Sequence, residues 1–203
     1  SDLNDPQGWI SDDTDAAERV RIQYGTSMCY PISSMGSHVS VVPNHQLNRI
    51  TSLHTRANVA YFGTFGYELD LNKLTDEEIA EVKAQIIFMK EYRELIQFGN
   101  FYRLKSPFDG NETVWMTVSE DKRKALVFWY RERNVVNAEF TRVRLQGLDP
   151  DLIYKNEYNG TENYGDELMN LGLLTTDVTA GEPTNEDLPC TDYESRIYVL
   201  TAE

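Results

Sequence analysis

The residues best suited to chemistry lie in segment 9–15, which reads Trp-Ile-Ser-Asp-Asp-Thr-Asp. Its carboxylates, Asp12, Asp13 and Asp15, follow an aromatic and apolar pair and precede a helical pattern. Catalytic residues of a (β/α)8 barrel lie at the carboxyl ends of its strands, so an acid in this position suits catalysis. Carboxylates at a helix start also cap the helix and complement its dipole. The spacing alone leaves both interpretations open.

The other residue types offer less evidence of a chemical role. The histidines, His38, His45 and His54, are irregularly spaced and form no H-E-x-x-H motif. The two cysteines, Cys29 and Cys190, lie far apart and form no C-x-x-C pair. No G-x-S-x-G motif is present. We therefore expect no metal site, no cofactor and no serine or cysteine nucleophile.

The first half of the chain contains strand and helix patterns that would position the acidic segment. Apolar residues at helical spacing predict a helix over 14–24, with Val20 and Tyr24 on one face. A β-branched run predicts a strand over 37–42, and a weaker pattern predicts another near 65–71. A capping box at Thr75 and Glu78 predicts a long helix to about residue 97, with Ile79, Val82, Ile86 and Met89 forming its apolar face.

Beyond Gly99 the apolar period changes from helical to two, which is typical of strands. Segments 113–118 and 125–130 should form a hairpin, because a short polar turn joins them. Further strands are predicted over 142–145, 152–154 and 197–200, and segment 175–189 is interpreted as an exposed acidic loop. Aromatic residues such as Trp115 and Trp129 could stack on sugars, but their alternation favours core and cross-strand pairs. The second half is thus predicted to be a small antiparallel β domain.

Two or three strand-helix units cannot close a sheet, and a complete (β/α)8 barrel needs about 250 residues, whereas this chain has 203. We therefore expect the first half to be the tail of a larger α/β domain, followed by the antiparallel β domain of the second half. The predicted domains are residues 1–99 and 100–203. The sequence begins without Met and without a signal-peptide pattern, so we expect a fragment of a cytoplasmic protein.

The composition excludes several classes of protein. The formal net charge is −14, from 19 basic and 33 acidic residues, and no basic cluster is present. Nucleic acid is therefore not an expected partner, because phosphate contacts need local positive charge. No apolar run approaches the roughly 20 residues of a membrane helix, so no membrane partner is expected either.

The sequence resembles the α-galactosidases of glycoside hydrolase family 36. The resemblance extends from about Trp9 to the C-terminus, and its motifs follow the family's order. The motif segments are 9–16, 22–27, 34–40, 42–46, 63–70, 90–97, 101–104, 106–108 and 166–169.

This resemblance implies an α/β plus all-β protein, the C-terminal portion of a (β/α)8 TIM barrel followed by an antiparallel β-sandwich domain. It also implies a function for the acidic segment. The family motif Trp-x-Ser-Asp-x-Thr-Asp carries the catalytic acid/base on its first Asp, which corresponds to Asp12 here. The family's nucleophile lies in an upstream Lys-Trp-Asp motif that this chain does not contain, and the Cys-Ser-Gly-Gly-type loop that helps to hold galactose is also missing. Retaining glycosidases need two carboxyl groups about 5–5.5 Å apart, so the chain alone should be inactive.

The expected function is therefore that of part of a retaining α-galactosidase, a hydrolase acting on terminal α-linked galactose of the melibiose or raffinose type. The alternative is a noncatalytic carbohydrate-binding or interaction β-sandwich module that carries a barrel remnant. The barrel units lack their neighbouring strands, so apolar faces such as that of Val82 and Ile86 should be incompletely covered. A homo-oligomer is expected for the same reason.

Overall fold

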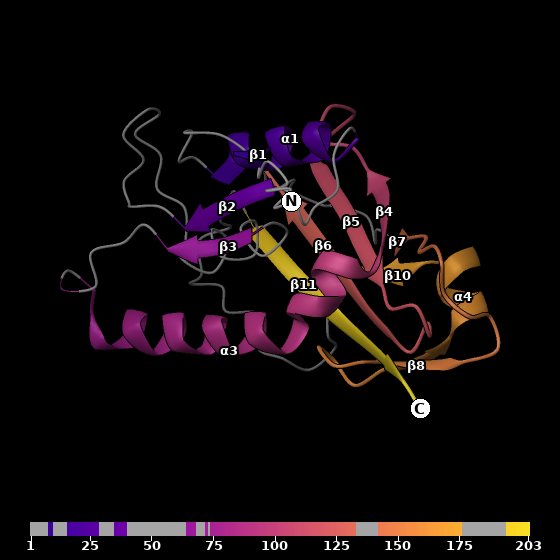
Figure 1. The fold of residues 1–203 in the computed structure, drawn as a ribbon. Coiled ribbons are helices and arrows are strands. Elements are labelled where there is room, and N and C mark those ends of the chain that lie inside the picture. The colour runs from indigo at the N-terminus through magenta and orange to yellow at the C-terminus, as the bar shows by residue number, and fades with distance from the viewer. Residues whose placement is uncertain are drawn as a thin grey trace, which may run out of the picture. The chain divides into compact units, whose positions relative to one another are not determined.

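A computed structural model describes residues 8–9, 16–28, 35–39, 64–67, 72, 74–132, 142–175 and 194–203. The chain divides into two compact units, residues 1–99 and 100–203 (Figure 1). The predicted exposed loop over 175–189 lies outside the described residues except for Thr175.

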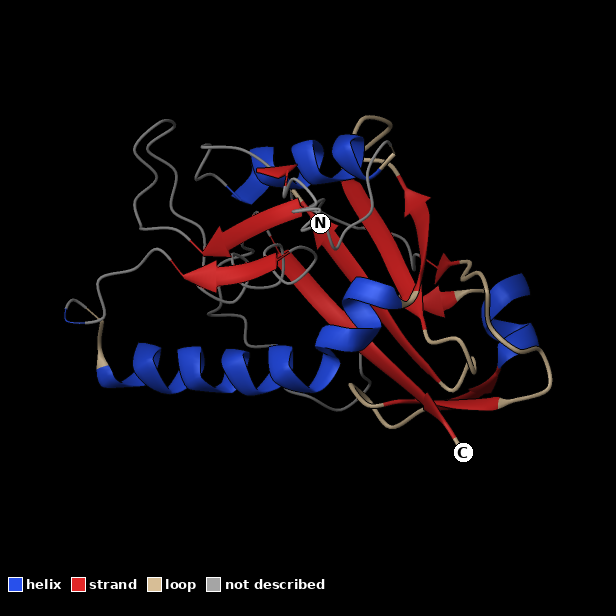
Figure 2. Ribbon diagram, viewed as in Figure 1, coloured by secondary structure: helices blue, strands red, loops and turns tan. Residues whose placement is uncertain are grey.

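The first unit contains a parallel three-stranded sheet in the order β1-β2-β3. Its strands are β1 (Gly8–Trp9), β2 (Met35–Val39) and β3 (Thr64–Tyr67), drawn as arrows in Figure 2. Helix α1 (Ala16–Ser27) connects β1 to β2, as parallel strands require a crossover connection. The predicted alternation of strands and helices is therefore confirmed, and β2 and β3 begin two residues and one residue before their predicted starts.

Helix α1 buries the face that its sequence predicts, since Val20 and Tyr24 are both buried. The helix extends three residues beyond the predicted end at Tyr24. The last turn is stabilised there because the hydroxyl of Ser27 donates a hydrogen bond of 2.7 Å to the carbonyl oxygen of Tyr24. Gly25 lies within the helix, where glycine costs only about 1 kcal/mol relative to alanine.

Helix α3 (Asp76–Phe98) begins at the predicted capping box. The hydroxyl of Thr75 accepts a hydrogen bond from the Glu78 amide at 3.2 Å, and the Glu78 carboxylate accepts one from the Thr75 amide at 3.3 Å. The predicted apolar face is partly wrong: Val82 and Met89 are buried, but Ile86 is 36% exposed. Gln85 occupies a buried position instead, where its amide donates to Glu81 at 3.3 Å.

The second unit is built on a six-stranded antiparallel sheet in the order β4-β5-β6-β11-β8-β9. The predicted hairpin is confirmed as β5 and β6, with Trp115 opposite Phe128. The last strand in sequence, β11, lies between β6 and β8 and pairs with both. The strands are β4 (Asn100–Lys105), β5 (Glu112–Val118), β6 (Lys124–Arg131), β8 (Ile153–Asn156), β9 (Glu162–Tyr164) and β11 (Glu194–Ala202).

A second layer covers one face of this sheet. It comprises the pair β7 (Arg142–Val143) and β10 (Leu173–Leu174) together with helix α4 (Gly165–Asn170). The core contains apolar side chains from both layers. Its buried members are Val114, Met116, Val118, Ala125, Val127, Trp129, Val143, Leu145, Leu148, Tyr154, Leu168, Leu173, Tyr198 and Leu200.

Both tryptophans of the central hairpin are buried, which confirms their predicted structural role. Trp129 belongs to the core described above, whereas Trp115 stacks on Phe128 with ring centroids 4.4 Å apart. Successive side chains of a strand point to opposite faces, so β5 and β6 are buried on both faces. Burial is therefore continuous along both strands, and the strands have no solvated face that polar residues would occupy in strict alternation.

A buried tyrosine joins two turns of the second unit. The Tyr154 hydroxyl donates to the carbonyl oxygen of Lys122, in the β5–β6 turn, and accepts from the Asp149 amide at 3.0 Å. Burial raises the pKa of this hydroxyl above its usual value near 10. The contact ties the tip of the central hairpin to the segment that leads into β8.

Candidate functional site

The carboxyl ends of the parallel strands define the first candidate site. Trp9 of β1 pairs with Gly36 of β2, and Gly36 pairs with Thr64 of β3, so the three strands run in register towards one edge. In barrel enzymes this edge carries the active site. Asp12 follows Trp9 by three residues and precedes Ala16, the first residue of α1, by four.

Asp12 itself lies outside the described residues, as do Asp13 and Asp15. Their chemistry is therefore argued from the strand before them and the helix after them. Of the histidines, His38 lies in β2, whereas His45 and His54 lie outside the described residues. Within the described ranges, no three His, Cys, Asp or Glu side chains lie close enough to hold a metal ion.

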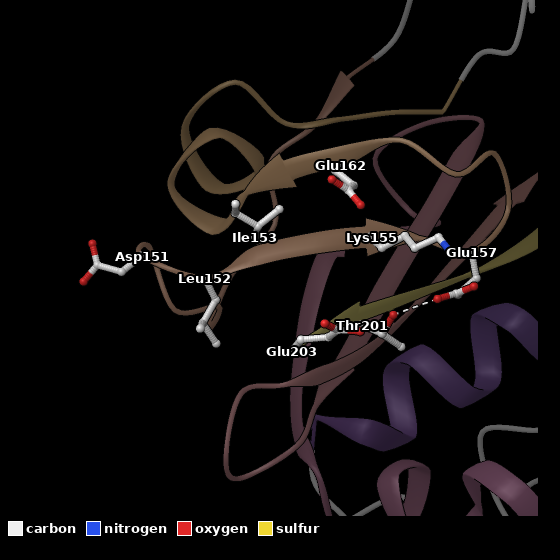
Figure 3. A pocket seen from close by; sticks show the side chains of 8 residues that line it. All are labelled: Asp151, Leu152, Ile153, Lys155, Glu157, Glu162, Thr201 and Glu203. Carbon is white, nitrogen blue, oxygen red and sulfur yellow. Dashed lines mark hydrogen bonds between the residues drawn. The ribbon is translucent and has the colours of Figure 1, made fainter.

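A second candidate site is a groove in the second unit, formed over β8, β9 and β11 (Figure 3). Its cavity volume is about 580 Å³. A cross-strand row runs through it, because Lys155 of β8 lies opposite Thr201 of β11 on one side and Glu162 of β9 on the other. The lining residues are Asp151, Leu152, Ile153, Lys155, Glu157, Glu162, Thr201 and Glu203.

The groove exists because buried and exposed residues alternate strictly along β8. Tyr154 and Asn156 are buried on the core face, which leaves Ile153 and Lys155 exposed on the other face. Glu157 continues this exposed row, and its carboxylate accepts a hydrogen bond of 2.7 Å from the Thr201 hydroxyl. No site was expected here from the sequence. Residues 153–157 read Ile-Tyr-Lys-Asn-Glu and do not alternate in hydropathy, so they carry no signal of a groove.

Family models match most of the chain in two consecutive parts. The model described as Melibiase matches residues 3–99, and that described as Glycosyl hydrolase family 36 C-terminal domain matches residues 112–200. The chain belongs to glycoside hydrolase family 36.

Curated relatives agree with this membership of family 36. The chain is 54% identical over 168 residues to "Alpha-galactosidase AgaA" of Geobacillus stearothermophilus, and 49% identical to "Alpha-galactosidase Mel36A" of Lactobacillus acidophilus. Each match covers 83% of this chain but 23% of the relative. The chain therefore spans about a quarter of the length of the family 36 relatives that it matches.

Solved structures of family 36 enzymes show the same fold. The α-galactosidase from Lactobacillus brevis matches with a TM-score of 0.90 at 48% identity, covering 98% of this chain and 26% of that one. AgaA matches with a TM-score of 0.86 at 48% identity, covering 95% and 25% respectively. These matches confirm the predicted fold class, the C-terminal portion of a (β/α)8 barrel followed by an antiparallel β-sandwich domain.

The described helices include none long and apolar enough to cross a membrane.

Proposed function

We propose that this chain is the C-terminal part of a retaining α-galactosidase and that Asp12 is its general acid/base. The observation that supports this most directly is the position of Asp12, three residues beyond the carboxyl end of β1 in a parallel βαβ unit. The names of the family 36 relatives supply the activity. We also propose residues 1–99 as the barrel part and 100–203 as the β domain; the division into two compact units supports this boundary.

In the proposed reaction, the Asp12 carboxyl group donates its proton to the glycosidic oxygen as the bond to the anomeric carbon breaks. A second carboxylate attacks that carbon and forms the galactosyl-enzyme. Asp12, now ionised, removes a proton from water as the water oxygen attacks the anomeric carbon. The bond from that carbon to the second carboxylate breaks, and galactose leaves with retention of configuration. The chain has no Lys-Trp-Asp motif to supply the second carboxylate, so we expect no turnover by the chain alone.

The proposed substrate class is an oligosaccharide with terminal α-linked galactose. Structures of AgaA variants have been solved in complex with raffinose and with stachyose, and the 48% identity of this chain to AgaA supports the same class here. A cytoplasmic location and a homo-oligomeric state remain predictions.

A chimera tests the role of Asp12. The region of AgaA that matches this chain is replaced by the chain, and hydrolysis of raffinose and of a nitrophenyl α-galactoside is measured for the parent chimera and for Asp12→Asn. General acid catalysis contributes about 10²–10⁴-fold, and a poor leaving group depends on it most. We expect a loss in this range on raffinose and a smaller loss in the galactosylation of the enzyme by the nitrophenyl substrate.

The matched control is Asp13→Asn, which removes the neighbouring carboxylate at a variable position of the family motif. Its kcat/KM should stay within a few-fold of the parent chimera. Equal losses for both substrates in Asp12→Asn, or a loss in Asp13→Asn as large as that in Asp12→Asn, would contradict the assignment of Asp12. The unfused chain should show no turnover of either substrate.

A further inference from the structure

We propose that the groove over β8, β9 and β11 binds a neutral oligosaccharide. This inference goes beyond the proposed hydrolytic function and does not depend on Asp12, because every residue that carries it lies in the second unit. The cavity volume of about 580 Å³ lies within the range of about 300–1,000 Å³ that holds small ligands.

The groove offers both donors and acceptors for sugar hydroxyl groups. Lys155 and Glu162 face each other across β8 and β9, and neither side chain forms an ion pair within the described part of the chain. The ammonium group of Lys155 can donate, and the carboxylate of Glu162 can accept. Hydroxyl groups do both, so a polyol matches this mixed lining better than a ligand that only donates or only accepts.

The arrangement of charge also indicates the class of ligand. Four carboxylates and one ammonium group give the groove a negative excess, which disfavours an anionic saccharide. A point cation would need several carboxylates at one position. Figure 3 shows them spread around the groove instead, with Asp151 and Glu157 at its two ends. The described residues contain no cluster that could hold a metal ion. Spaced acceptors suit an extended ligand with many hydroxyl groups.

An apolar surface adjoins the polar row. Ile153 on β8 lies directly opposite Tyr164 on β9, and each is 47% exposed. Paired residues on neighbouring strands project from the same face of the sheet, so the tyrosine ring lies beside the aliphatic side chain. Aromatic rings carry a broad apolar face with a polar hydroxyl at one end. The C–H face of a sugar ring can pack on such a surface while its hydroxyl groups reach Lys155 and Glu162.

The experiment is a titration of the ¹⁵N-labelled 203-residue chain with raffinose, followed by amide chemical shifts. We expect saturable shifts in β8, β9 and the end of β11, with a dissociation constant in the millimolar range. Tyr164→Ala should weaken binding by about three- to tenfold, as expected for the loss of an aromatic contact. Lys155→Ala should weaken it as well.

Phe108→Ala is the matched control, because Phe108 is an exposed aromatic residue outside the groove and its loss should not alter binding. The amide shifts of the first unit should stay unchanged at raffinose concentrations that saturate the groove, which separates this site from the proposed catalytic one. Two outcomes would overturn the proposal: no saturable shifts in β8, β9 and β11 on addition of raffinose, or saturable shifts there that Tyr164→Ala leaves unchanged.

Discussion

Replacing Tyr154 by phenylalanine removes one hydroxyl group that serves two backbone partners. The ring stays, so the buried side chain keeps its packing and no large cavity forms. Two groups lose their partner: the carbonyl oxygen of Lys122 and the amide of Asp149. Lys122 is exposed, so water can hydrate its carbonyl group, whereas Asp149 is half-buried. A buried group left without a partner costs about 1–3 kcal/mol, and exposure of one of the two partners places this loss near the lower half of that range.

We therefore expect Tyr154→Phe to lower the free energy of unfolding by about 1.5 kcal/mol. Urea unfolding followed by tryptophan fluorescence is the assay, because Trp115 and Trp129 are buried in the same unit as Tyr154. With a urea m-value of about 1–1.5 kcal/mol/M, the midpoint should fall by about 1 M. Tyr164→Phe is the matched control: this hydroxyl lies on a half-exposed residue of β9, and its loss should leave the midpoint unchanged.

The same hydroxyl predicts a pH dependence. Its pKa is higher in the folded protein than in the unfolded chain because burial disfavours the phenolate. The stabilisation is therefore fully present below pH 10 and is lost as the pH rises through the folded pKa. The difference in urea midpoint between the parent and Tyr154→Phe should therefore become smaller in this alkaline range. A urea midpoint of Tyr154→Phe within about 0.2 M of the parent's at neutral pH would refute the reasoning. So would a difference between the two midpoints that widens above pH 10.

Two further substitutions test backbone features of the fold. Gly165→Ala would place a Cβ atom against the carbonyl group of Asp149, which is backbone and cannot turn aside, so we expect a loss of more than about 3 kcal/mol in thermal or urea unfolding. Gly110→Ala, whose Cβ meets nothing within 4 Å, should unfold as the parent does, and similar losses at both positions would contradict this explanation. Thr75→Ala should lower the stability of α3 by about 1 kcal/mol, because it removes the acceptor for the Glu78 amide. Thr75→Ser retains a hydroxyl acceptor and serves as the control. Circular dichroism melts with equal midpoints for the two variants would contradict the capping role.

Local patterns in the sequence predicted those elements whose residues determine them directly. The capping box at Thr75 predicted the start of α3, and the apolar run of β5 and β6 predicted their hairpin. Strand β9 and helix α4 were not predicted. They contain three and six residues, too few to show a period, and β9 forms through its pairing with β8.

The error on α3 has a physical cause. Helical spacing assigned Ile86 to the buried face, but its neighbour Gln85 is buried instead and hydrogen-bonds to Glu81 one turn earlier. A polar residue can be buried when a partner satisfies it, and a sequence pattern based on hydropathy does not include that possibility.

The two candidate sites also differ in how far the sequence predicts them. Asp12 could be singled out because a motif surrounds it, although its structural setting is known only through β1 and α1. The groove could not be foreseen, because it depends on β11, from a distant part of the chain, pairing with β8 beside the β8–β9 hairpin.

The central place of β11 in its sheet has a consequence for biosynthesis. Five of the six strands are synthesised before β11, yet β6 and β8 become neighbours of one strand only when it inserts between them. Until then each of them presents an unpaired edge, which is a template for pairing with another chain. Pairings between residues far apart in sequence also form slowly. Aggregation of this domain during expression should therefore be greatest in the interval between synthesis of β6 and arrival of β11.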